Sequence, residues 1–380
     1  MEHTTLRYIL ILLTVAVIVV VALRRLRLPA VIAYLLTGLL VGPHMLGWIP
    51  DSAETRDLAE FGVVFLLFSL GLEFSLPRLI VMRRAVFVLG GAQVGLTTLG
   101  TAFMAWLFGA HLAVAIVLGG AFAMSSTAIV VKQLAEQTEL GLQHGRLAVA
   151  VLLFQDLAVV PFLILIPALT HGTGAALAGA LAWAFFKGLV VFAVILVLGR
   201  WVLRPVFHQI ASARSTELFT IAALLITLVA AWSTAEMGLS LALGAFLAGM
   251  MLAETEFRHQ VEADIRPFRD ILLGLFFVTV GMLLNPYTVL RHWWLLLIVV
   301  ASLLLFKTVL IAFLSRLLGV ERAAALRTGL VLAQGGEFGF ALLALGLSAN
   351  VIRASVAEFA LAVIVVSMLV SPLLIRINRV

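Results

Sequence analysis

A single acidic residue lies deep inside one long apolar stretch of this sequence. Asp156 occurs in LLFQDLAVVPF, about nine residues after the start of the apolar run. A helix that rises about 1.5 Å per residue would place it ~13 Å deep, near the middle of a bilayer core about 30 Å thick. Burial favours the neutral acid, so the group can hold a proton, and its oxygens also suit a monovalent cation. Asp156 is therefore the first candidate ion-binding residue, and a structural ion pair is the alternative.

A basic residue lies at a similar depth in a second run. Lys307 occupies the centre of LLLFKTVLI, and a lone ammonium group at this depth needs a partner. The positions predict a contact between Asp156 and Lys307, with a purely structural tie between core helices as the alternative. Gln155, beside Asp156, can donate or accept a hydrogen bond and joins the candidate ion-binding residues.

Two further runs contain polar or glycine-rich interruptions. One reads AFAMSSTAIVV and the other AQGGEFGFA, in which Glu337 follows two glycines. Such interruptions predict discontinuous helices, whose free carbonyls and helix ends form ion sites in transporters. The predicted break residues are Ser125, Ser126, Thr127, Gly335 and Gly336. The hydroxyl groups could instead bond within their own helix. Glu337 could be satisfied by the N-terminus of the opposing half-helix, and this structural role is favoured over direct ion binding.

The composition indicates what must position these residues. The chain has 380 residues, 63% hydrophobic and 12% charged, with a mean hydropathy of +1.20. Soluble domains have roughly 45–50% apolar and about 25% charged residues, so a soluble enzyme is excluded and an all-α polytopic membrane protein is expected. The net charge is +6, but the basic residues lie between apolar runs, where they set topology, so nucleic acid is not an expected partner. The sequence has no cysteine, which excludes disulfides and thiolate metal sites.

Thirteen apolar runs predict about 13 transmembrane helices. Their approximate ranges are 6–23, 29–46, 58–74, 85–108, 112–131, 147–169, 176–198, 217–235, 239–253, 271–285, 293–318, 324–347 and 356–375. With this arrangement, 19 Lys and Arg residues fall on one side of the membrane and 4 on the other. Because cytoplasmic loops are rich in Lys and Arg, the N-terminus is predicted outside and the C-terminus in the cytoplasm. No cleavage site follows the first run, which is therefore expected to be retained.

A weak internal repeat links the two halves of the chain. Gly71 aligns with Gly281, and the small residues of the second run align with those of the ninth. Both matches are seven runs apart, and an odd offset inverts the second half in the membrane. The expected repeats are 6–169 and 217–375, joined by a linker helix at 176–198, in one transmembrane unit covering residues 1–380. Common small-residue packing is the alternative explanation.

Segment 253–270 is the most densely charged part of the chain and carries both signs of charge. It is expected to form a cytoplasmic loop, which is either an ordinary solvated loop or a regulatory or docking surface.

These motifs together resemble one family. LLFQDLAVVP, AMSSTAIV, GLSLALGAFLAGMMLAE, LLGLFFVTVGM and LAQGGEFGF are similar to segments of the Kef-type potassium efflux systems, in the monovalent cation:proton antiporter-2 family. The similarity covers essentially the whole chain. It implies a multi-pass homodimer in the bacterial inner membrane, with two crossed, broken helices. The family's ion-binding aspartate falls on Asp156, its preceding glutamine on Gln155, and its core lysine on Lys307.

The resemblance also implies regulation. The family's regulatory loop falls on HQVEADIRPF, with His259, Glu262 and Asp264 in matching positions, while Arg266 departs from the acidic residue of typical members. Kef-type proteins carry a nucleotide-binding domain after the last helix, and this sequence ends at Val380 without one. Nucleotide or glutathione is therefore expected only through such a domain or a cytoplasmic regulatory subunit, and no cofactor is expected within this chain.

The sequence thus predicts a secondary antiporter, not an enzyme, that exchanges K⁺ for H⁺ by exposing Asp156 to each side in turn. Na⁺/H⁺ exchange is an alternative, because one carboxylate with carbonyl oxygens suits either cation. A ligand-gated potassium channel is a second alternative, distinguished by flux that neither saturates nor couples to a counter-gradient. A receptor that uses a transporter fold is a third, and the retained Asp156 and Lys307 argue against it.

Overall fold

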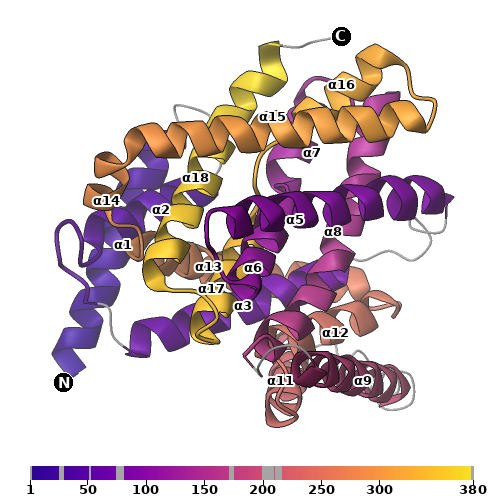
Figure 1. The fold of residues 1–380 in the computed structure, drawn as a ribbon. Helices are drawn as coiled ribbons and strands as arrows, with labels where there is room; N and C mark the ends of the chain where they lie inside the picture. The colour runs from indigo at the N-terminus through magenta and orange to yellow at the C-terminus, as the bar shows by residue number, and fades with distance from the viewer. Residues whose placement is uncertain are drawn as a thin grey trace. The chain divides into compact units, whose positions relative to one another are not determined.

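A computed structural model describes residues 2–24, 30–50, 53–73, 81–170, 175–198, 209 and 216–377. The secondary structure of these residues is helical, without a strand (Figure 1). The chain divides into two compact units. The first contains 1–50, 77–162 and 280–380, and the second contains 51–76 and 163–279.

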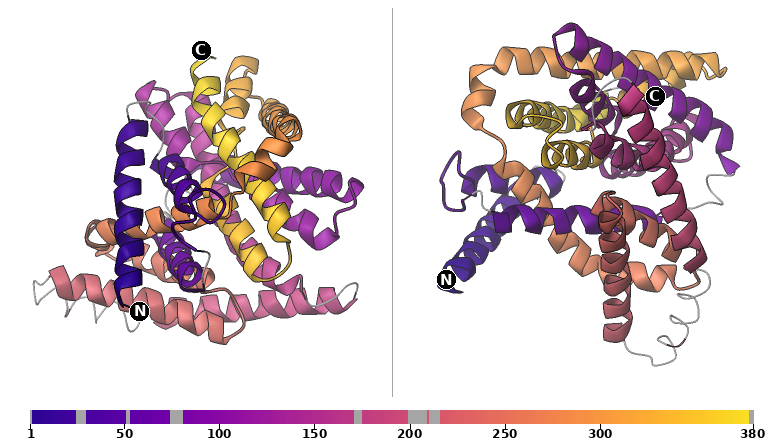
Figure 2. Two further views of the ribbon diagram at one scale, coloured as in Figure 1. Left: turned by 90° about the vertical axis from the view of Figure 1, so that its left-hand side faces the viewer. Right: turned by 60° about the horizontal axis from the view of Figure 1, so that its bottom comes forward.

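The first unit contains the helices expected to hold the candidate site (Figure 1). They are α1 (Glu2–Arg24), α2 (Ala30–Val41), η1 (Ala85–Gly90), α5 (Gly91–Leu107), α6 (Leu112–Ala123), α7 (Thr127–Glu136), α14 (Pro286–Arg291), α15 (Trp293–Leu317), α16 (Arg322–Val331), α17 (Glu337–Ser348) and α18 (Ala354–Ile377). Most of α8 (Gln143–Ala168) also belongs to this unit. α15 packs against α5, α16 and α18, and α17 packs against α6. The N-terminal helix α1 lies alongside α2, as the left view of Figure 2 shows.

The second unit contains α3 (Ala53–Glu73), α9 (Ala175–Leu198), α11 (Thr216–Glu236), α12 (Leu241–Ala253) and most of α13 (Arg258–Met282). α12 is buried along most of its length and is capped by Ser240, whose hydroxyl accepts a hydrogen bond from the Leu243 amide at 3.2 Å. α12 approaches α3 closely at two glycines. A Cβ atom on Gly71 would lie 2.2 Å from the Phe246 carbonyl oxygen, and one on Gly249 would lie 2.1 Å from that of Phe68.

Each of the thirteen apolar runs coincides with helical residues. Among the described residues, six helical segments are long and apolar enough to cross a membrane, and shorter apolar helices accompany them. A multi-pass all-helical chain is therefore confirmed, whereas the count of 13 spans stays a prediction.

One expectation was wrong. Segment 253–270 is not a loop from end to end, because α13 begins at Arg258 and continues to Met282. Val261 and Ile265, one helical turn apart, are fully buried in the second unit's core with Phe68 and Phe219. Hydropathy marked only the apolar half of this helix, since an amphipathic helix outside the bilayer keeps one charged face.

Two close contacts in the first unit repeat at a fixed spacing. A Cβ atom on Gly119 of α6 would lie 2.5 Å from the Thr98 carbonyl oxygen of α5, and one on Gly329 of α16 would lie 2.3 Å from that of Thr308 in α15. Each residue of the second contact lies 210 positions after its counterpart in the first. The same spacing separates Gly71 from Gly281.

Candidate ion-binding site at two helix breaks

Two helical segments of the first unit are interrupted near their middles. α6 ends at Ala123 and α7 begins at Thr127, so the predicted residue Thr127 is the first helical residue after this break. Met124 and Ser126 have extended backbones, and the Ser126 hydroxyl accepts a hydrogen bond from the Ile129 amide at 3.3 Å. This cap satisfies one of the free amides at the start of α7.

The second interruption separates α16, which ends at Val331, from α17, which begins at Glu337. Gly336 is extended, and the amide of Gly335 donates to the Ser367 hydroxyl of α18 at 3.0 Å. The glycines therefore occupy the break, as their positions in the sequence predicted.

The two breaks are in direct contact. A Cβ atom on Gly336 would lie 2.4 Å from the Ser125 carbonyl carbon, so this position admits no side chain without a backbone shift. The Ser125 hydroxyl donates to the Leu332 carbonyl at 2.8 Å. Residues some 200 positions apart in the chain thus form one backbone-lined junction.

Lys307 connects the two breaks from α15. Its fully buried ammonium group donates to the Met124 carbonyl at 3.0 Å, to the Ser125 hydroxyl at 3.0 Å and to the Gln334 carbonyl at 2.8 Å. Met124 and Gln334 follow the C-terminal ends of α6 and α16, where the helix dipole carries partial negative charge. The positive ammonium group therefore compensates the partial negative charge at the C-terminal ends of both α6 and α16.

The predicted contact between Lys307 and Asp156 stays a prediction, because the hydrogen bonds that the structure gives the ammonium group go to the breaks. An ammonium group has three donors, and the carbonyls and hydroxyl at the breaks accept all three. The sequence prediction considered only charged partners for Lys307, because backbone carbonyls inside a continuous helix are already occupied. The breaks release such carbonyls, and two of them accept hydrogen bonds from the lysine.

Glu337 performs the complementary role at the helix N-termini. It is the first residue of α17 and is 8% exposed, and its carboxyl group faces its own amide, the Ala128 amide and the Ser126 hydroxyl. The amides at the start of α7 and α17 carry partial positive charge. Within the described residues, Lys307 and Glu337 thus each pair with helix ends, and not with one another.

Asp156 lies beside this junction on α8. It is half-buried and directly follows Gln155, whose side-chain oxygen accepts the Ser125 amide at 2.8 Å. The Gln155 amide nitrogen donates to the Ser125 hydroxyl at 3.2 Å and to the Gln93 side-chain oxygen at 2.8 Å. These bonds make Gln155 a positioning residue that connects the α8 backbone at Asp156 to the first break.

Sequence reasoning missed two glutamines of this network. Gln93 of α5 is fully buried, and its side chain donates to the Ala123 carbonyl at 3.0 Å, at the end of α6. Gln334 is also fully buried, and its side-chain amide makes no hydrogen bond to any described residue. A buried polar residue in an apolar run was the signal that could have found both.

His259, Glu262 and Asp264, the predicted regulatory residues, lie in the second unit on the first turns of α13. His259 is exposed, whereas Glu262 and Asp264 are half-buried. Burial raises the pKa of the Asp264 carboxyl group. A helical surface therefore replaces the predicted regulatory loop.

A second buried charge cluster lies in the first unit and was not predicted. Arg327 of α16 is fully buried and donates to the Glu139 carboxylate at 2.8 Å and 3.1 Å, and to the Gln137 side-chain oxygen at 2.8 Å. It also donates to the Ile375 carbonyl of α18. His144 contacts the same Glu139 oxygen at 2.9 Å. Sequence analysis counted Arg327 only as a topology signal.

We expect Arg327→Met to destabilise the fold by about 3–5 kcal/mol at neutral pH, because Glu139 would be left buried without its main cation. Burial raises the pKa of Glu139, but the hydrogen bonds from Arg327 and His144 outweigh it and hold the pKa below 4.5. Because folding lowers the pKa of Glu139, its ionised form stabilises the fold at pH values above its usual pKa. This stability is lost as the pH falls through the folded-state pKa. The difference between the variant and the native chain should therefore shrink below about pH 4.5.

Unfolding of the detergent-solubilised protein, followed by fluorescence at several pH values, measures this effect. Arg322→Met is the matched control, because Arg322 is exposed on the same helix. Equal stability of the two variants at neutral pH would show that the buried cluster contributes little.

Comparison with known proteins agrees with a membrane ion exchanger. The family model described as "Sodium/hydrogen exchanger, transmembrane" matches residues 9–377, and the chain therefore belongs to this family. The Kef-type resemblance is also confirmed. The chain is 46% identical over 374 residues to the putative K(+) efflux antiporter KefB of Alkalimonas amylolytica, covering 98% of this chain and 57% of the relative.

A second relative is K(+) efflux antiporter 1, chloroplastic, of Arabidopsis thaliana, 43% identical over 349 residues, which are 90% of this chain and 29% of that protein. The chain thus spans little more than half of one relative and under a third of the other. The sodium proton antiporter MjNhaP1 of Methanocaldococcus jannaschii has a similar solved structure, with a TM-score of 0.70 at 17% identity, over 97% of this chain and 94% of that one. That likeness concerns the fold.

Proposed function

We propose that this chain is the transmembrane part of a secondary antiporter that exchanges K⁺ for H⁺, and that it is not an enzyme. The observation that carries the proposal is the junction of two helix breaks, held by Lys307 and Glu337, directly beside Asp156. A rigid, charge-compensated backbone junction can hold a carboxylate near the middle of the membrane. Membership of an exchanger family and the similarity to K(+) efflux antiporters support the choice of cation.

The proposed mechanism uses one carboxylate for two ions. Asp156 holds either a proton or a cation, because neutralising the carboxylate removes the charge that attracts the cation. Ser125, Ser126 and Thr127 supply hydroxyl or carbonyl oxygens near the break, and Gln155 fixes the backbone on which Asp156 stands. No resident cofactor takes part, since the transported ions carry the charge.

Na⁺/H⁺ exchange is the second candidate, favoured by the family description and by the fold of the sodium proton antiporter. Flux measured in liposomes with K⁺, Na⁺ or Rb⁺ under a pH gradient tests both candidates. We expect saturable cation flux that dissipates the pH gradient, fastest with K⁺. Faster exchange with Na⁺ would favour the second candidate, and cation flux without proton movement would favour a channel.

We further propose that residues 6–169 and 217–375 are inverted repeats joined by a linker helix at 176–198, and that their broken helices cross. The equivalent contacts of Gly119 and Gly329, at a constant spacing of 210 residues, support a repeat. The corresponding breaks before Thr127 and Glu337 have the same spacing.

The proposal places the protein as a homodimer in a bacterial inner membrane, with 13 spans, the N-terminus outside and the C-terminus in the cytoplasm. Ser52 and Arg214 fall in loops that this topology places on opposite sides, but they lie outside the described residues. Trp48 and Leu142 replace them, because both are exposed and follow α2 and α7. We expect single cysteines there to react with an impermeant thiol reagent from opposite sides, and the cysteine-free chain provides a clean background. If both cysteines react from the same side of the membrane, this topology is wrong.

We also propose that the charged face at the start of α13 binds a cytoplasmic regulatory domain or subunit. His259 is exposed there, and Glu262 and Asp264 are half-buried, with one Asp264 oxygen making no hydrogen bond to the described residues. Glu262→Gln with Asp264→Asn should change the control of flux in a full-length protein. Unchanged regulation would reduce this face to a structural helix end.

A further inference from the structure

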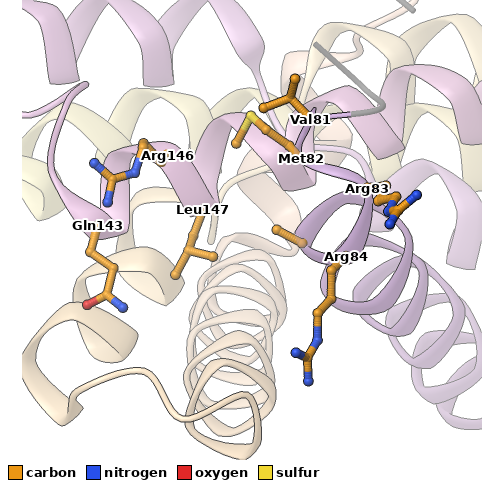
Figure 3. Close-up of a pocket in the computed structure, with 8 residues that line it drawn as sticks. Val81, Met82, Arg83, Arg84, Gln143, Arg146 and Leu147 are labelled. Atoms are coloured by element: carbon orange, nitrogen blue, oxygen red, sulfur yellow. The ribbon is translucent and has the colours of Figure 1, made fainter. Parts of the chain in front are cut away.

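A cavity of about 640 Å³ lies in the first unit, and none of the residues found to line it belongs to the helix breaks (Figure 3). Its volume is within the range of small-molecule sites, roughly 300–1,000 Å³. The residues that line it include Met82, Arg83, Arg84, Gln143, Arg146 and Leu147. Figure 3 shows them extending from two helical segments that are about sixty residues apart in the chain.

Three arginines line this cavity, and no acidic residue is among the described residues of its lining. Arg83 and Arg84 form no hydrogen bond or ion pair with the described residues, while Arg146 donates to the Gly141 carbonyl at 2.6 Å. Like charges gathered around one cavity repel each other, and a bound anion would relieve this repulsion. Guanidinium groups bind phosphate oxygens through paired hydrogen bonds, so phosphate is the anion that fits best.

The basic residues lie close to the starts of two helical segments. The helical segment Ala85–Leu107 begins directly after Arg84, and α8 begins at Gln143. Neither α8 nor η1 has an acidic residue in its first turn.

The position and the apolar lining indicate the source of the phosphate. Both segments are long and apolar enough to cross a membrane, so their first residues lie where the chain enters the bilayer, at the level of the lipid headgroups. Met82 and Leu147 provide apolar surface beside the arginines, and Val81 is 85% exposed at the same place. A soluble phosphate compound would make no use of this apolar surface.

We propose that this cavity binds the phosphate group of an anionic phospholipid. Arg83, Arg84 and Arg146 surround the phosphate, the Gln143 amide bonds to a polar headgroup, and Leu147 contacts the first carbons of an acyl chain. The site is distinct from the proposed ion site, and its occupancy does not depend on transport.

Native mass spectrometry of the purified chain tests the site. The protein is released from neutral detergent in the presence of equal amounts of phosphatidylglycerol and phosphatidylcholine. The native chain should retain phosphatidylglycerol preferentially. The triple variant Arg83→Gln, Arg84→Gln, Arg146→Gln should lose this preference by roughly 100-fold, because each basic residue contributes about one kcal/mol to anionic lipid binding.

The matched control removes the same charge elsewhere. Arg291→Gln, Arg322→Gln and Arg353→Gln change three exposed arginines of the same unit that lie outside the cavity lining. This control should keep the native preference. If the site variant fails to fold, the corresponding lysine variant keeps the charge but not the paired hydrogen bonds, and it should show a smaller loss of several-fold.

Competition identifies the source of the phosphate. Glycerophosphoglycerol and inorganic phosphate carry the same anion without acyl chains, and neither should displace the lipid at equal concentration. Displacement by either would overturn the assignment to a lipid and indicate a soluble phosphate ligand. Equal loss of lipid in the site variant and the control, or no preference for the anionic lipid in the native chain, would overturn the site itself.

Discussion

Asp156→Asn should abolish coupled exchange, lowering cation-dependent proton flux at least about 100-fold, while the protein remains folded. Asparagine has the same size as aspartate but cannot bind or release a proton near neutral pH, so one of the two exchanged ions loses its site. The half-buried position on α8 tolerates a neutral side chain of this shape. The measurement is proton flux in liposomes driven by a cation gradient, with unfolding temperature as the check on folding.

Two variants make this result interpretable. Asp156→Glu keeps the ionisable group and should retain part of the exchange. Glu321→Gln removes an exposed carboxylate of the same unit and should leave the flux unchanged. If Asp156→Asn exchanges cation for protons at a near-native rate, the assignment to Asp156 is wrong, and Glu337 becomes the next candidate because its carboxyl group is also buried.

Lys307→Met should be the most destabilising single substitution in the candidate site, at about 3 kcal/mol or more. Methionine preserves the volume of the side chain but donates no hydrogen bond. The Met124 and Gln334 carbonyls would then lose the ammonium group that satisfies them, at about 1–3 kcal/mol for each buried group left unpaired. The two helix ends would also lose their compensating charge.

Thermal and denaturant unfolding of the purified protein measures this effect. Lys187→Met is the matched control, because the Lys187 ammonium donates to a single carbonyl, that of Met237, in an exposed position. The control should change stability by less than about 1 kcal/mol. Comparable losses for the two lysines would contradict the role assigned to Lys307 at the breaks.

The positions of the helix breaks could be predicted because their local sequences are unsuited to a continuous buried helix. Adjacent glycines at Gly335 and Gly336 weaken a helix, and neighbouring hydroxyl groups at Ser125 and Ser126 compete for its backbone. The structure places both breaks at these residues. Local composition thus determined where each helix stops.

The partners of the buried charges could not be predicted in the same way. Lys307 was expected to contact a carboxylate, and its hydrogen bonds to carbonyl groups released by the breaks were not predicted. Arg327 looked like a loop charge, yet it is fully buried against Glu139. The Lys307–Met124 and Arg327–Glu139 contacts join residues 183 and 188 positions apart, and periodicity along the chain contains no information about such contacts.

The extent of α13 illustrates a different limit. Apolar periodicity identified its second half, since that half is continuously hydrophobic. The first half is amphipathic, with Val261 and Ile265 on the buried face and charged residues on the other. Hydropathy therefore reports how much of a helix is apolar and underestimates the length of one that extends beyond the apolar region.

If a proton and a cation compete for one carboxylate, the apparent KM for K⁺ must depend on pH. The assay measures initial K⁺ flux in liposomes over a range of K⁺ concentrations, at several pH values equal on both sides of the membrane. We expect the apparent KM to fall as the pH rises and then to become constant once Asp156 is fully ionised, because protons no longer occupy the site. An apparent KM that does not change with pH would contradict it.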